Sequence, residues 1–246
     1  MEQIPSNTPI MESKPGVAGW FAIWMKAVSK PSEQTFVEIT ESPEAKMQTA
    51  FIWVFIATTV IALASALIQG VSAFLGVAPT MPPIPGLEQY IDPSMMQQTG
   101  SPIMALVIGL CVAPLAGLIA IPFFALGVAI VQWVAKLFKG EGSFEKLAYA
   151  FAAITLPVSL VSAVLTLLSA IPFVGLCFSF ISIGVSIYSV VLQVYAVKAV
   201  NRFPTFGPAV GSVLIPGAVI FLVFCICIVV IAFAMGAAMG GQGFAP

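Results

Sequence analysis

The chain has no histidine and few charged residues of either sign. Its 246 residues include nine basic and ten acidic side chains, for a formal net charge of −1. Without histidine, the chain lacks the commonest acid–base side chain and the commonest metal ligand. The balanced charge gives no general attraction for nucleic acid. Charged residues make up 8% of the sequence, against about 25% in soluble domains, which is too few to cover a water-soluble protein of this length.

Hydrophobic residues are abundant instead. They account for 60% of the sequence, and the mean hydropathy is +1.08. This composition predicts an integral membrane protein. The chain opens with a polar stretch rich in proline, so residues 1–18 are expected to be a disordered tail and not a signal peptide.

The four cysteines, Cys111, Cys177, Cys225 and Cys227, all lie inside apolar runs. The last two are two residues apart, so on a helix they point in different directions and do not form a CxxC motif. We interpret all four as small apolar residues of membrane helices. The chain shows no nucleophile–base pair, metal cluster or phosphate-binding loop. We therefore predict no catalytic residue, no metal, no cofactor and no enzymatic activity.

Long uncharged runs predict five transmembrane helices, because a crossing needs about 20 apolar residues. The third and fourth spans share one uncharged run, and Pro172 and Gly175 mark the turn between them. The expected fold class is all-α, a polytopic bundle of five helices within residues 47–240. The spans are placed at residues 47–70, 102–135, 144–170, 173–197 and 207–235.

Basic residues alternate between the segments that flank these spans. Counted from the N-terminus, the six segments carry 4, 0, 3, 0, 2 and 0 basic residues. Lysine and arginine are enriched in cytoplasmic loops. The pattern predicts a cytoplasmic N-terminus and a short outer tail at residues 241–246.

Charges and glycines gather in the second of the basic loops. Gly140 and Gly142 are expected to let the chain turn there. Ser143 is placed to cap the third span, with Glu145 in the first turn, where the helix dipole favours an acidic side chain.

Residues 19–46 predict two short cytoplasmic helices. Pro31 ends the first, and Ser32 caps the second. In the first, Trp20, Ile23 and Trp24 begin one helical stripe. Such a stripe is typical of an amphipathic helix at the membrane interface, but also of a helix that packs on its own protein or binds a partner. The candidate interface or partner-contact residues are Trp20, Phe21, Ile23, Trp24, Lys26 and Lys30.

Apart from Glu145 and Lys146 at the start of the third span, the predicted spans contain no charged side chain, and a charged side chain inside a span is the usual marker of an ion or proton pathway. Three glutamines near span ends are expected to reach the lipid headgroups: Gln69, Gln132 and Gln193. Serines spaced along residues 179–189 favour helix packing over a solute path. Small residues at four-residue spacing, along 62–70 and 109–117, predict close helix contacts within the chain, with a homodimer as the alternative.

The order of these features resembles the prokaryotic branch of the Yip1 domain family. A tryptophan-bearing helix leads to the sequence KPSEQTFVEI, which begins at Lys30. The glycine loop, a tyrosine, a proline and the turn IPFVG then follow in that order. The positions that carry the resemblance are Pro31, Phe36, Gly140, Gly142, Ser143, Phe144, Tyr149, Pro157, Pro172 and Gly175.

The resemblance implies five spans, a cytoplasmic N-terminus and a bacterial plasma membrane. Eukaryotic relatives associate with prenylated Rab GTPases, but the acidic N-terminal motif of those proteins has no match in this chain. We expect a membrane organiser or adaptor that acts by binding, with the lipid bilayer and other membrane proteins as partners. The alternatives are an accessory subunit of a larger complex and a transporter or channel for a small or lipidic solute.

Overall fold

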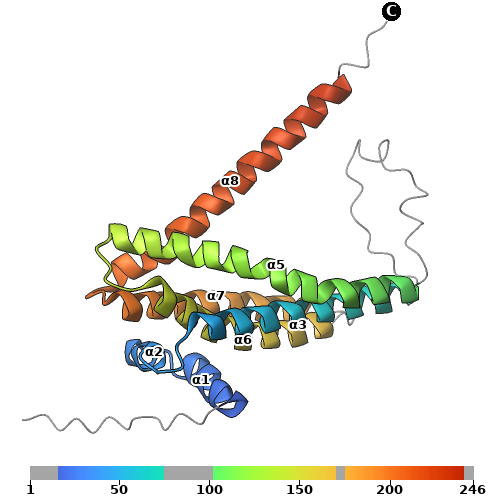
Figure 1. Ribbon diagram of the computed structural model, residues 1–246. Helices are drawn as coiled ribbons and strands as arrows, with labels where there is room; N and C mark the ends of the chain where they lie inside the picture. Colours follow the sequence, from blue (N-terminus) through green and yellow to red (C-terminus); the bar gives the residue numbers. More distant parts are fainter. Residues whose placement is uncertain (1–15, 75–101, 170–174, 241–246) are drawn as a thin grey trace, which may run out of the picture.

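The computed structural model describes residues 16–74, 102–169 and 175–240, and all regular secondary structure in these ranges is helical (Figure 1). The all-α prediction is therefore confirmed for the described residues. The helices are α1 (Val17–Ser29), α2 (Glu33–Thr40), α3 (Met47–Phe74), α5 (Pro102–Leu137), α6 (Phe144–Ser169), α7 (Gly175–Asn201) and α8 (Phe206–Gly240).

Four helices, α3, α5, α6 and α7, are long and apolar enough to cross a membrane. α8 begins with the apolar stretch Phe206–Val219, and its sequence stays uncharged to Gly240. With 35 residues, α8 is about 50 Å long. A fifth crossing by α8 stays a prediction.

The four helices lie side by side in a bundle whose central member is α6 (Figure 1). α6 contacts α3, α5 and α7, and it also contacts α1 and α2. After its first three residues, two turns of α6 are buried on all sides, from Leu147 to Ile154, because neighbouring helices surround them. α8 packs on α5 and α7 near its start and then leaves the bundle (Figure 1).

One end of the bundle gathers the charged side chains. The helices alternate in direction, so α3, α6 and α8 begin where α5 and α7 end, and the hairpin of α1 and α2 lies beside this end (Figure 1). We call it the charged end. Its charged residues in the described chain are Lys26, Lys30, Glu33, Glu38, Glu41, Glu44, Lys46, Lys136, Lys139, Glu141, Glu145, Lys146, Lys198 and Arg202.

The small-residue spacing of α3 and α5 brings these two helices into close contact. A Cβ added at Gly109 would lie 2.7 Å from Ala66 Cβ, and one added at Gly117 would lie 2.3 Å from Thr59 Oγ1. Side chains larger than glycine would therefore push the helices apart. The prediction that these residues make contacts within the chain is confirmed.

Candidate functional site

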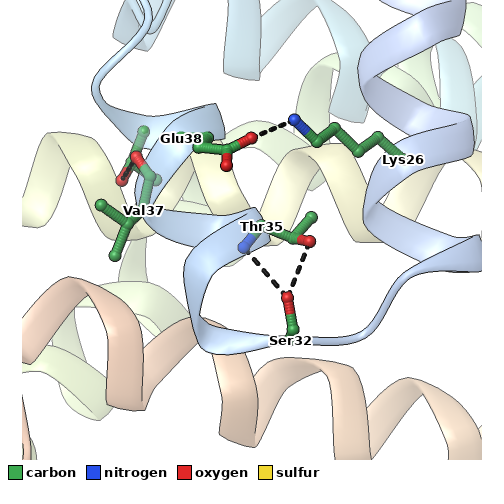
Figure 2. A network of polar contacts seen from close by, with 6 residues as sticks. Lys26, Ser32, Thr35, Val37 and Glu38 are labelled. Atoms are coloured by element: carbon green, nitrogen blue, oxygen red, sulfur yellow. Dashed lines mark hydrogen bonds and ion pairs between the residues drawn. The ribbon is translucent and has the colours of Figure 1, made fainter. Parts of the chain in front are cut away.

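The hairpin of α1 and α2 is held together by polar contacts at the charged end. Ser32 Oγ accepts a hydrogen bond from Thr35 N at 3.1 Å, which is the N-cap predicted for the second helix. Lys26 on α1 forms an ion pair with Glu38 on α2 (Figure 2). The two helices are therefore joined at their connection and along their facing sides.

The hairpin packs on the bundle through both helices. Phe36 of α2 is fully buried in the core. Glu33 forms an ion pair with Lys198 of α7, and Tyr188 Oη donates a hydrogen bond to the Val28 carbonyl at 2.6 Å. Because the ion pair is partly exposed, it contributes no more than about 1 kcal/mol. The apolar contacts therefore provide most of the attachment.

Four rings form an aromatic cluster between α1 and the bundle, made of Trp20, Trp24, Trp53 and Tyr149. The ring centroids of Trp24 and Trp53 are 5.6 Å apart, and those of Trp53 and Tyr149 are 4.9 Å apart. Trp20 meets Trp53 edge-on at 5.9 Å. Such pairs contribute about 0.5–1.5 kcal/mol each beyond the apolar area that they bury. The tryptophan stripe therefore packs on its own protein, one of the alternatives that the sequence left open.

The opposite face of α1 is apolar and exposed. Phe21 and Met25 are 60% and 50% exposed, and they are neighbours at i and i+4. Ile23, by contrast, is buried, and Lys26 forms an ion pair with Glu38. Of the six candidate interface residues, Phe21 is thus the apolar side chain most available to lipid or a partner, and Lys30 is an exposed cation.

A second buried contact joins the loop between α5 and α6 to the end of α7. Gln132 Nε2 donates to the Gly142 carbonyl at 2.7 Å and to Asn201 Oδ1 at 2.9 Å. Asn201 Oδ1 also accepts from Gly142 N at 3.2 Å. We call Gln132, Gly142 and Asn201 the amide cluster. Each of the three residues forms a hydrogen bond with the other two, so the loop is fixed against α5 and α7.

The expectation that Gln132 reaches the headgroups is wrong. Gln132 is 4% exposed and Asn201 is 1% exposed. The loop's peptide groups are buried and need partners, and a side-chain amide supplies both a donor and an acceptor. From its interior position, Gln132 donates a hydrogen bond to the Gly142 carbonyl of the loop. A glutamine side chain that reached the headgroups would leave this carbonyl without that donor.

Both positions in the loop need glycine, because atoms near the end of α7 lie too close to leave room for a side chain. A Cβ at Gly140 would lie 2.6 Å from Asn201 Oδ1, and a Cβ at Gly142 would lie 2.7 Å from that atom and from the Val200 carbonyl oxygen. Gly140 N also bonds to the Ala135 carbonyl at 2.9 Å, which closes the end of α5. The sequence predicted the turn, whereas the structure shows that the glycines also let α7 approach.

The start of α6 is organised by the residues that the sequence singled out. Ser143 Oγ accepts from Lys146 N at 3.4 Å, the position of the predicted N-cap. Glu145 Oε1 accepts from Met47 N at 3.3 Å, so the acid also links α6 to the start of α3. Phe144 packs against the core. These contacts border an open cavity of about 400 Å³ lined by Thr40, Glu41, Ser42, Ala45, Ser143, Glu145 and Lys146.

The remaining predicted positions lie away from the charged end or outside the described residues. Pro157 is inside α6, and Gly175 begins α7, where a Cβ would lie 2.5 Å from the Ser169 carbonyl oxygen. Pro172 lies outside the described residues. Ser179 and Ser186 of α7 are exposed, and their hydroxyls donate to carbonyls of their own helix. These two hydroxyls are therefore paired within α7.

Asn201 is the residue that the sequence reasoning missed. It is a single amide at the end of an apolar helix, next to Arg202. No sequence signal marked it: Lys139 and Arg202 follow the ends of α5 and α7 with positive φ, and Glu141 N donates a hydrogen bond to the Asn201 carbonyl at 3.3 Å, but only the structure shows that these two helix ends meet. No metal-binding group of three or more histidine, cysteine or acidic residues occurs in the part of the chain that the structure describes.

The apolar helical bundle and its sequence identify the class and the family. Four helices long enough to cross a membrane, with the charges gathered at one end, define an integral membrane protein. A family model for the Yip1 domain matches residues 26–228. The chain therefore belongs to the Yip1 domain family. No curated protein and no solved structure matches the chain.

Proposed function

We propose that this protein is a non-enzymatic membrane organiser or adaptor that acts by binding at its charged end. The observation that supports this proposal is the docked hairpin, which is held by the aromatic cluster while Phe21 and Met25 stay exposed. A surface that is ordered before it binds avoids most of the entropy cost of ordering. The hairpin therefore suits a role in holding lipid or another membrane protein.

The proposal includes a placement in the membrane. The chain crosses the bilayer five times in a bacterial plasma membrane, as in the prokaryotic branch of the family, with the N-terminus cytoplasmic and the C-terminus outside. The 35-residue length of α8 and the position of the basic side chains at the charged end support this placement. The exposed face of α1 then lies at the cytoplasmic surface.

Removing the exposed apolar face of α1 tests the binding role. The double variant Phe21→Ser with Met25→Ser is expected to lose most of its bound partners, while its stability changes by only about 0.5 kcal/mol, because both side chains are exposed. The measurement is affinity capture from native membranes in a mild detergent, with mass spectrometry and a thermal-unfolding check.

A matched control is Leu137→Ser, which alters an exposed apolar side chain at the same end of the bundle. It should keep the partners. Trp20→Ala with Trp24→Ala should both lose partners and unfold more easily, because those rings pack on Trp53. Unchanged capture by the Phe21 and Met25 double variant would contradict the proposed binding face.

The second candidate function is an accessory subunit of a larger membrane complex. The observation that favours it is α8, whose described side chains beyond Pro216 are exposed except for the partly buried Cys225, and they include Val219, Phe221 and Leu222. A neighbouring subunit would cover such a helix as readily as lipid does. Stoichiometric co-purification of other membrane subunits would select this candidate, and a lone particle would reject it.

A further inference from the structure

Two helix ends meet at the charged end, and an exposed cation follows each of them. Lys139 comes after the end of α5 with a φ of 65°, and Arg202 comes after the end of α7 with a φ of 55°. At both places the next N–H bonds to the carbonyl five residues back, which closes the helix end. Glu141 N donates to the Asn201 carbonyl at 3.3 Å, so the two turns are in contact.

The conformation of these two residues normally belongs to glycine. A side chain is strained at positive φ, and glycine is the usual residue just after a helix end. The helix dipole favours a cation near the C-terminus, but Lys136 and Lys198 already supply one in the last turns of α5 and α7. Strained backbone of this kind occurs at functional sites. The strain at Lys139 and Arg202 therefore indicates a use for their charges.

The acidic side chains of the charged end leave these cations largely uncompensated. Glu33 and Glu38 are in ion pairs, Glu41 and Glu145 line the cavity, and Glu44 precedes α3. Within the loop that joins α5 and α6, Glu141 is the acidic residue. It stands against three exposed cations, Lys136, Lys139 and Arg202, which we call the basic patch. The basic patch therefore carries a net positive charge.

Exposed apolar side chains adjoin the basic patch on α5. Trp133 and Leu137 are 65% and 64% exposed, and they are neighbours at i and i+4. α5 is long enough to cross the membrane and ends here, so its last lysines lie at the level of the lipid phosphates. Tryptophan is enriched at this level. A phospholipid with an anionic headgroup complements both the charge and the apolar surface.

We propose that the basic patch binds the headgroup of an anionic phospholipid, whose acyl chains lie along Trp133 and Leu137. The lipid phosphate accepts hydrogen bonds from the Arg202 guanidinium and from the ammonium groups of the two lysines. No part of the fold has to move, because all of these side chains are exposed. The site contains no residue of α1 or α2, so it is independent of the proposed function.

A thermal-shift titration of the lipid-depleted full chain in detergent tests the site. Short-chain phosphatidylglycerol should raise the unfolding temperature of the wild-type protein. The double variant Lys139→Gly with Arg202→Gly should bind this lipid about tenfold or more weakly, because two cations are lost. Without lipid, its unfolding temperature should rise by about 2–4 °C per site, because glycine relieves the strain. A merely structural role would change the stability and leave the affinity as it is.

The matched control removes two exposed cations of the same end that lie outside the basic patch. Lys30→Gln with Lys46→Gln changes the net charge by the same amount as the glycine variant. It should keep the wild-type affinity for phosphatidylglycerol. A loss of affinity equal to that of the glycine variant would show general charge attraction and would overturn the site.

Phosphatidylcholine of the same chain length and free glycerol phosphate separate the possible ligands. An equal shift with phosphatidylcholine would overturn the anionic headgroup, and an equal shift with glycerol phosphate would overturn the lipid. Equal affinities of the wild type and the glycine variant, or no shift at all, would overturn the site. If the glycine variant does not fold, Glu141→Gln decides. It removes the exposed acid of the loop, so the affinity for phosphatidylglycerol must rise, and an unchanged affinity overturns the proposal.

Discussion

Gly142→Ala is expected to lower the unfolding temperature of the detergent-solubilised protein by roughly 10 °C. The new Cβ would lie 2.7 Å from both Asn201 Oδ1 and the Val200 carbonyl oxygen. The loop must move away, at an overpacking cost of about 1–3 kcal/mol. That movement also breaks the hydrogen bonds that Gly142 makes with Gln132 and Asn201, which leaves buried groups unpaired and adds about 1–3 kcal/mol.

Gly127→Ala is the matched control for this variant. Gly127 lies in α5, and a Cβ there would meet nothing within 4 Å. Alanine is the better helix former, so the unfolding temperature should stay the same or rise slightly. Equal effects of the two substitutions would show that the amide cluster does not hold the loop.

Trp53→Ala is expected to cost about 3–5 kcal/mol of stability, because it leaves a large cavity in the core. Trp53 is fully buried, and it contacts Trp20 and Trp24 as well as Tyr149. Its loss removes the surface on which α1 packs. Amide hydrogen exchange in Val17–Ser29 should therefore speed up much more than exchange in α5.

Trp133→Ala gives the comparison for this prediction. Trp133 is 65% exposed on α5, so its removal should change the stability by about 0.5 kcal/mol and leave exchange in α1 unchanged. If Trp53→Ala left α1 as protected as in the wild type, the aromatic cluster would not be what attaches the hairpin.

Some helix boundaries could be predicted, because a charged loop or a proline and glycine turn bounds the apolar run there. Residues 144–170 were expected for the third span and α6 is Phe144–Ser169, while α5 ends at Leu137, two residues beyond the prediction. The short helix Glu33–Thr40 and its Ser32 cap also followed from the sequence, because its start and stop signals are local. α3 runs to Phe74, four residues past its predicted end, since nothing charged interrupts it there.

The contacts between distant segments could not be predicted in the same way. Helical periodicity identified the tryptophan face of α1, but it does not say whether that face meets lipid or Trp53. Gln132 and Asn201 are 69 residues apart, and a glutamine near a helix end suits a headgroup as well as a buried loop. Pairings of this kind depend on how the bundle closes, so a single sequence without a structure does not reveal them.

The side of the membrane on which each end of the chain lies tests the central claim most directly. The measurement combines a C-terminal alkaline phosphatase fusion with maleimide labelling of Lys139→Cys in a variant without the four native cysteines. Five crossings with a cytoplasmic charged end predict an active phosphatase outside and an introduced thiol that reacts only from the cytoplasmic side. An inactive phosphatase together with cytoplasmic labelling of the Lys139→Cys variant would mean that α8 does not cross. A label that reacts only from outside would place the charged end, and the docked hairpin with it, on the wrong side for a cytoplasmic adaptor.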